Sequence, residues 1–181
     1  MRFRPYSPAD REQCLELYRL NEPGRFPEGV LEDYNRVLKG TGYILVLEQG
    51  GRIIATGGLH HITGRNMTMF WCGLVHPDFQ GRGVGTALFY ARIALLNTDL
   101  MLQKICIAAV QASFGFYQRF GFAHIRNWKD KQGTEHPIGF LTVCEADIRL
   151  VRSILAKSGI EVPLKDMTAV PFRSPEAEAV A

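Results

Sequence analysis

The pattern of apolar and polar positions predicts two helices near the start of the chain. Residues 2–4 can form a short strand, and Ser7 then provides the N-cap of a helix that runs to about Leu20, with Pro8 in its first turn. A second helix fits 28–39, because its apolar residues recur three or four positions apart. This apolar stripe consists of Val30, Leu31, Tyr34, Val37 and Leu38.

Three strands are predicted next. The β-rich runs 43–48, 53–62 and 67–75 are separated by short turns rich in glycine and asparagine at 49–52 and 64–66. Because tight turns join antiparallel neighbours, these three runs predict an antiparallel meander.

The second half of the chain alternates between helix and strand. An apolar face at helical spacing predicts a helix over 83–97, and a short buried-type strand fits 104–109. A short helix at 113–120 and strands at 122–127 and 139–144 follow.

The remaining segments are a loop, a helix and a tail. The polar stretch 129–137 predicts a loop, and the apolar positions of 147–157 follow one side of a helix. From Pro163 onward there is no periodicity, which predicts a loose tail. The resulting order of elements, β-α-α-β-β-β-α-β-α-β-β and a final helix, predicts an α+β fold with a mixed sheet.

The most informative segment lies between the third predicted strand and the helix over 83–97. Gly81, Gly83 and Gly85 alternate in a short loop that opens this helix. Glycines allow the backbone to approach a ligand closely, and the first N–H groups of a helix have no internal partner. Together with the helix dipole, these groups predict an anion site, and the spacing favours a pyrophosphate cradle at 80–86.

Two common nucleotide loops do not fit this segment. The dinucleotide fingerprint needs a glycine where the chain has Thr86, and the P-loop needs a lysine, which is missing between positions 40 and 103. A simple flexible turn before a helix is the alternative interpretation of three alternating glycines.

Gln80, Gly83 and Gly85, preceded by Val75-His76-Pro77, resemble the acetyl-CoA-binding motif of the GNAT acyltransferase superfamily. The segment Phe116–Phe122 is similar to a second family element, in which a tyrosine commonly acts as general acid. The resemblance covers about residues 1–144. It implies a cofactor site for acetyl-CoA, the cosubstrate, at Leu74, Val75, His76, Gln80, Gly81, Arg82, Gly83, Val84, Gly85 and Thr86.

The resemblance also implies the architecture. It predicts a GNAT fold, with a mixed, mostly antiparallel central sheet flanked by helices. The strands 67–75 and 104–109 are expected to splay apart and bind acyl-CoA between them. The domain would span 1–144, with a C-terminal helix and loose tail at 145–181.

Acyl transfer to an amine needs a proton donor for the departing thiolate and an acceptor for the amine's proton. The resemblance makes Tyr117 the candidate acid. Many family members carry a glutamate where this chain has Met69, so the base is sought elsewhere. His60 and His61 are candidates, of which only one can face the cleft because neighbouring strand residues point to opposite faces. A chain of water molecules is an equal alternative.

Other departures and histidines complete the candidates. Val110 replaces a frequent family asparagine, and Gln111 or Ser113 could supply its polar contact. His76 is interpreted as structural, whereas His124 and His136 have no supporting context.

Composition narrows the function classes. The length of 181 residues, with 46% hydrophobic and 22% charged residues, predicts one globular domain. The net charge is only +3 and there is no run of basic residues, so neither nucleic acid nor a membrane is an expected partner. The N-terminus lacks a signal-peptide pattern, so a cytoplasmic protein is expected. The cysteines at 14, 72, 106 and 144 fit no metal or redox spacing, so most are expected to be reduced core residues and no metal site is expected.

The sequence therefore predicts an acetyl-CoA-dependent N-acetyltransferase that acts on an amine of a small molecule or peptide by direct attack in a ternary complex. The alternatives are a non-catalytic acyl-CoA-binding module and a partner-binding protein on a GNAT scaffold. The acceptor pocket is expected from the first two helices and the loops 21–28 and 129–138, without a clear charge preference. A homodimer is compatible with the sequence.

Overall fold

The computed structural model describes most of the chain. The described residues are 1–22, 26–27, 29–39, 43–62 and 65–164. The first residue of the predicted helix 28–39, part of the loop 21–28, the start of the turn 64–66 and the tail after 164 lie outside these residues.

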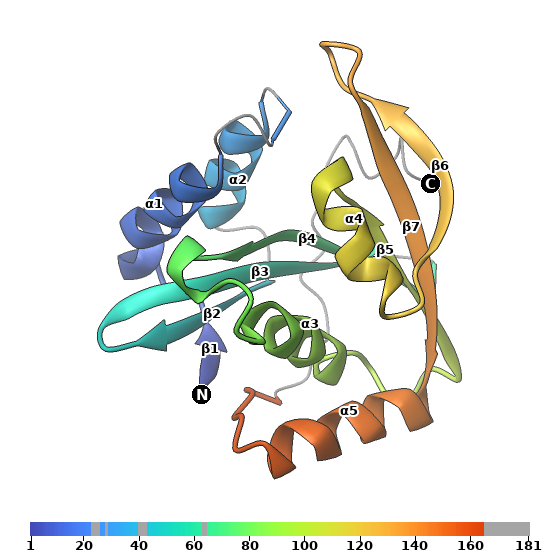
Figure 1. The fold of residues 1–181 in the computed structure, drawn as a ribbon. Helices are drawn as coiled ribbons and strands as arrows, with labels where there is room; N and C mark the ends of the chain where they lie inside the picture. Colours follow the sequence, from blue (N-terminus) through green and yellow to red (C-terminus); the bar gives the residue numbers. More distant parts are fainter. Residues whose placement is uncertain (23–25, 28, 40–42, 63–64, 165–181) are drawn as a thin grey trace.

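A seven-stranded sheet forms the centre of the molecule, with the strand order β1-β2-β3-β4-β5-β7-β6 (Figure 1). All neighbouring strands are antiparallel except β4 and β5. The predicted α+β class and the order of the elements are confirmed. The strands are β1 Phe3–Pro5, β2 Tyr43–Gln49, β3 Arg52–Ile62, β4 Met67–Val75, β5 Leu102–Ala108, β6 Ala123–Lys129 and β7 Glu135–Cys144. The helices are α1 Arg11–Asn21, α2 Val30–Leu38, α3 Val84–Ala94, α4 Gln111–Gln118 and α5 Glu145–Lys157.

Helices cover both faces of this sheet, so the central strands are apolar on both sides. In β2, Ile44 and Val46 pack with α1 and α2, whereas Leu45 and Leu47 pack with α3 and α5. This arrangement explains the near-continuous apolar run of β2, since alternation is lost when both faces of a strand are buried.

The strands β4 and β5 separate after a short parallel ladder. Residues Met67–Phe70 pair with Lys104–Ile107, but β4 continues to Val75 without a β5 partner. The splay that the resemblance implied is therefore present. Within the unpaired part, the ladder to β3 is irregular, and Cys72 has a φ of +43°, as expected at a β-bulge that bends a strand.

The predicted loop at 129–137 is wrong. The strand β6 extends to Lys129 and β7 already begins at Glu135, so this segment forms the tip of a hairpin (Figure 1). The sequence pattern does not predict this hairpin, because β6 is an exposed edge strand and Pro137 normally argues against a strand. The proline is tolerated because it lies beyond the end of the β5–β7 ladder at Ala108–Ile138, where its carbonyl accepts a hydrogen bond from the Ala109 N–H at 3.0 Å.

Several boundaries also differ from prediction. A 3-10 turn over Pro8–Asp10 precedes α1, and Asp10 accepts a hydrogen bond from the Ser7 backbone N–H at 2.7 Å. The helix α3 ends at Ala94 and β5 starts at Leu102, so the predicted 83–97 helix is too long and the predicted 104–109 strand too short. The predicted helix 113–120 begins and ends two residues earlier, as α4.

The C-terminal helix α5 packs against α3 and shares its core. Ile148, Val151 and Leu155 belong to the same buried cluster as α3, and Arg152 donates a hydrogen bond to the Ala94 carbonyl at 2.9 Å. The division at 144 stays a prediction. Among the described helices, none is long and apolar enough to cross a membrane.

The four cysteines divide into two pairs by burial. Cys14 and Cys106 are fully buried, and burial raises the pKa of each thiol to about 12. Cys72 and Cys144 are half-buried. Core placement is therefore found for two of the four.

Candidate functional site

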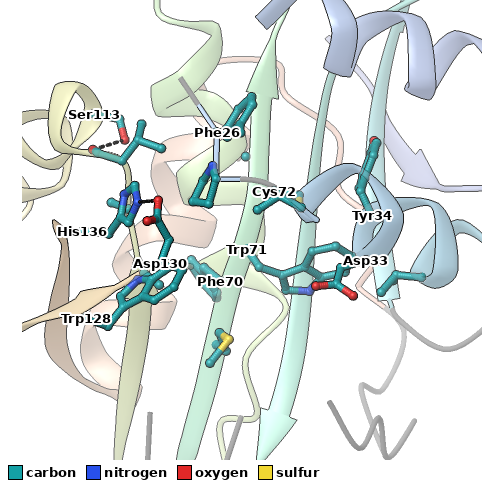
Figure 2. A pocket seen from close by; sticks show the side chains of 18 of the residues that line it. Phe26, Asp33, Tyr34, Phe70, Trp71, Cys72, Ser113, Trp128, Asp130 and His136 are labelled. Carbon is teal, nitrogen blue, oxygen red and sulfur yellow. Dashed lines mark hydrogen bonds and ion pairs between the residues drawn. The ribbon is translucent and has the colours of Figure 1, made fainter. Parts of the chain in front are cut away.

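A cavity of about 400 Å³ lies where β4 and β5 diverge (Figure 2). Its walls come from β4, the end of β5, the first turns of α4, the helix α2 and the tip of the β6–β7 hairpin. Aromatic rings dominate the lining, contributed by Phe26, Tyr34, Phe70, Trp71 and Trp128. The cavity therefore offers a largely apolar passage with a few polar groups, as expected of a small-molecule site.

Trp71 on β4 lines the cavity, and its ring position depends on Gly58. It lies over Gly58 of β3 so closely that a Cβ on Gly58 would come 2.2 Å from its ring. Its ring also meets the Tyr34 ring edge-on, with centroids 6.3 Å apart. Glycine at position 58 is what allows the indole to occupy this position.

Tyr117 reaches the cavity from α4. Its ring packs edge-on against Phe89, Phe116 and Phe122, with centroids 5.1 to 6.4 Å apart. Its hydroxyl lies 3.4 Å from the position that a Cβ on Gly73 would take. The tyrosine thus brings a hydroxyl to the unpaired part of β4, on a ring held by packing.

The two adjacent histidines of β3 have different surroundings. His60 is 6% exposed and lines the cavity, where it pairs across the ladder with Met69. Burial lowers its pKa below 6.5, with a smaller contribution from His61. His61 is not among the lining residues, and its Nδ1 lies 3.4 Å from the Thr68 hydroxyl. The expectation that only one of the pair faces the cleft agrees with this placement, and that one is His60.

The hairpin tip adds a polar group that sequence reasoning missed. His136 and Asp130 are each 6% exposed, and their Nε2 and Oδ2 atoms lie 2.8 Å apart on the cavity wall (Figure 2). The Trp128 ring lies tilted against the His136 ring, with centroids 5.0 Å apart. The hydrogen bond with His136 holds the pKa of Asp130 below its usual range. His136 has no supporting context in the sequence because its partners, Trp128 and Asp130, come from β6 and the hairpin tip.

The glycine loop leads from β4 into α3. Gly81 and Gly83 have φ values of +71° and +81°, in the left-handed region that favours glycine, and a Cβ on either would meet nothing within 4 Å. Gly83 is the N-cap of α3 and provides no side-chain cap. The first backbone N–H groups of α3 are therefore left for a ligand or water.

The other predicted cofactor residues differ in what they can offer. The Gln80 amide donates to the Val75 carbonyl at 3.0 Å and to Asn21 at 3.1 Å, which ties the loop to β4 and α1. His76 is buried with its Nε2 2.5 Å from Arg52, as expected of a structural residue. Leu74 and Val84 are also buried, so only their backbone could contact a ligand. Arg82 is exposed, and Gly85 and Thr86 are half-buried.

The asparagine replacement and its candidate substitutes lie at the start of α4. Val110 is the N-cap, and Ser113 lines the cavity while its hydroxyl donates to the Val110 carbonyl at 3.0 Å. Gln111 is exposed and does not line the cavity. Of the two, only Ser113 is placed to contact a ligand there.

Arg92 is a second group that sequence reasoning missed. It is the only charged residue of α3 and is 1% exposed, on the face that meets the sheet. A lone charge in an otherwise apolar helix was the available signal.

Comparison with known proteins gives the family. The model of the acetyltransferase (GNAT) family matches residues 11–122. No curated protein sequence matches the chain significantly.

Many solved structures share the fold. An aminoglycoside 6′-N-acetyltransferase complexed with coenzyme A is 11% identical, with a TM-score of 0.62 over 80% of this chain and 97% of the other. The ribosomal-protein-S18-alanine N-acetyltransferase from Escherichia coli is 16% identical, with a TM-score of 0.61 over 78% and 93%. The PaiA N-acetyltransferase from Thermoplasma acidophilum, in complex with coenzyme A, is 16% identical, with a TM-score of 0.57 over 76% and 96%.

The splayed sheet, the glycine loop at the start of α3 and the family model agree. The chain belongs to the GNAT acetyltransferase family, which uses acetyl-CoA.

Proposed function

We propose that this protein is an N-acetyltransferase that moves an acetyl group from acetyl-CoA to an amine of a small molecule or peptide, by direct attack in a ternary complex. One observation carries the proposal. A single cavity at the β4–β5 splay is lined both by Tyr117, from the side of α3 and α4, and by His60, from the face that α2 covers. Donor and acceptor could thus meet from opposite sides of the sheet.

The cofactor side of this arrangement fits acetyl-CoA. The N-terminus of α3, with Gly83 at its cap, suits the pyrophosphate because free N–H groups and the helix dipole both favour an anion. The unpaired backbone of β4 beyond Phe70 suits the amide groups of the pantetheine arm. When bound, acetyl-CoA supplies an activated acyl group with a thiolate leaving group.

We assign the proton-removing role to His60. It pairs with Met69, the position at which many relatives carry a glutamate, and directly paired residues have Cβ atoms about 5 Å apart. Since burial lowers the pKa of His60, the ring is neutral at pH 7 and can accept a proton. Tyr117 is placed to donate a proton to the departing sulfur. His136, on the hairpin, is the second candidate base.

The acceptor is expected to enter between α2 and the hairpin tip. Aromatic rings there suit an apolar body next to the amine. The carboxylates of the lining are already paired, Asp33 with Arg36 and Asp130 with His136, each at 2.8 Å.

Initial-rate kinetics test the proposal. Acetyl-CoA and a panel of primary amines should release coenzyme A with intersecting double-reciprocal lines, because both substrates occupy the site before transfer. Parallel lines would indicate an acyl-enzyme instead. Tight acetyl-CoA binding without release across the panel would favour the non-catalytic module, and absence of binding would favour a partner-binding scaffold.

A further inference from the structure

Arg92 is a buried cation that forms no ion pair with the described residues. Its side chain is 1% exposed, and neither Nε nor Nη1 has a hydrogen-bond partner among these residues. No carboxylate in the described part of the chain forms an ion pair with it. Its guanidinium lies 4.6 Å from the centre of the Phe70 ring, which accommodates the cation but does not neutralise it.

Two glycines make room for this side chain. A Cβ on Gly57 of β3 would lie 3.3 Å from its Nε, and a Cβ on Gly73 of β4 would lie 3.3 Å from its Nη2. The Tyr117 hydroxyl would lie 3.4 Å from the same Cβ on Gly73. The guanidinium and the hydroxyl therefore both border Gly73 in the splayed strand, on its α3 side.

An unpaired buried charge is costly, so its presence points to a use. The group that would complete it is an anion small enough to fit beside Gly73. Building on the proposed function, in which Tyr117 faces the sulfur of coenzyme A, we propose that Arg92 binds this sulfur and stabilises it as a thiolate.

The role follows from the charge balance of the transfer. The amine nitrogen forms a bond to the acetyl carbon, the carbon–sulfur bond breaks, and its electron pair stays on sulfur. The amine loses one proton to the base, and Tyr117 returns one proton to the sulfur. Between these events the sulfur carries a negative charge, and a fixed cation stabilises it without reorganisation.

Tyr117 is the titratable group that borders Gly73 together with Arg92. β3 presents Gly57 and Leu59 to α3, and β4 presents Phe70 and Gly73. His60 lies on the opposite face of β3. A pH effect that requires the sulfur atom can therefore be separated from one that arises in the protein.

Binding of coenzyme A and of desulfo-coenzyme A, measured by titration calorimetry from about pH 7 to about pH 10, tests the proposal. The ratio of their dissociation constants isolates the sulfur and cancels protein titrations. In the native protein, preference for coenzyme A should rise by up to about tenfold with pH, which is the limit for a thiol titrating one unit lower when bound. The ultraviolet absorbance of the thiolate should follow the same curve.

Arg92→Met is the decisive variant, because its flexible apolar chain can fill the slot beside Phe70 without a charge. Its ratio should stay within about twofold across the range, whereas Arg92→Lys should retain part of the rise. If Arg92→Met does not fold, as judged by circular dichroism, Arg92→Gln replaces it with the same expectation.

The proposal would be overturned if the ratio of dissociation constants did not change with pH in the native protein. It would also be overturned if the ratio rose as much in the uncharged variant as in the native protein. Equal weakening of both ligands in that variant would mean that Arg92 only shapes the pocket. If neither ligand bound the native protein, the proposed function itself would fail.

Discussion

Placing one negative charge at Gly83 should weaken acetyl-CoA binding through electrostatics alone. The left-handed φ of +81° penalises any side chain by roughly 1–2 kcal/mol, but aspartate and asparagine adopt this conformation more readily than other residues. A Cβ there meets nothing within 4 Å, so either side chain fits. Gly83→Asp and Gly83→Asn therefore form a matched pair that shares size and strain and differs in charge.

The magnitude follows from Coulomb's law. Two unit charges about 5 Å apart interact by about 0.8 kcal/mol in water and by about 3 kcal/mol at an effective dielectric constant of 20. The Gly83→Asp variant should therefore bind acetyl-CoA about 4-fold to 150-fold more weakly than Gly83→Asn. Because the loop is exposed, the lower half of this range is expected.

Calorimetric titration at two salt concentrations measures the effect. The gap between the two variants should shrink strongly at 1 M salt, where the screening length is about 3 Å. Any loss that both variants share reports strain at the helix start. Equal dissociation constants at low salt, in two variants with the native melting behaviour, would refute the placement of the pyrophosphate at this loop.

Five further outcomes are expected. Acetyl-CoA at about 100 times its Kd should stabilise the protein by about 2.7 kcal/mol in thermal unfolding, and NAD or ATP should do much less. Tyr117→Phe should lower kcat by about 10²–10⁴ while the Kd of acetyl-CoA changes little; an unchanged single-turnover rate would remove the hydroxyl from the mechanism. His60→Gln should flatten the rising limb of kcat/KM, which the lowered pKa of His60 places on the acid side of pH 6.5, whereas His61→Gln keeps it. Because burial lowers the folded-state pKa of His60, the unfolded chain binds more protons below about pH 6.5, so acidification should destabilise the native protein more than His60→Gln in urea titrations. Gly58→Ala should displace Trp71, whose ring would lie 2.2 Å from the new Cβ, and raise the KM of the acceptor but not the Kd of acetyl-CoA.

Local sequence signals were sufficient where local physics decides the structure. The helix α2 and the β2–β3 hairpin are predicted to within about two residues at their described ends, because spacing and tight turns depend on neighbouring residues alone. Gly83 opens α3 as expected, since a left-handed residue before a helix calls for glycine. The motif around it pointed to the family before any fold was known.

The cleft itself depends on contacts between distant segments. Strand alternation shows that His60 and His61 point to opposite faces, but only the packing of α2 on one face decides which of them reaches the cavity. His136 becomes a buried partner of Asp130 because an edge hairpin folds back beside α4, and its polar residues give no periodic signal. Arg92 looks like an ordinary helix residue until Gly57 and Gly73, on two other elements, are seen to make room for it. The sequence by itself thus determined most of the elements, the family and the glycine loop that opens α3, which arise from short-range geometry, whereas the charges and rings that line the site were decided by tertiary packing.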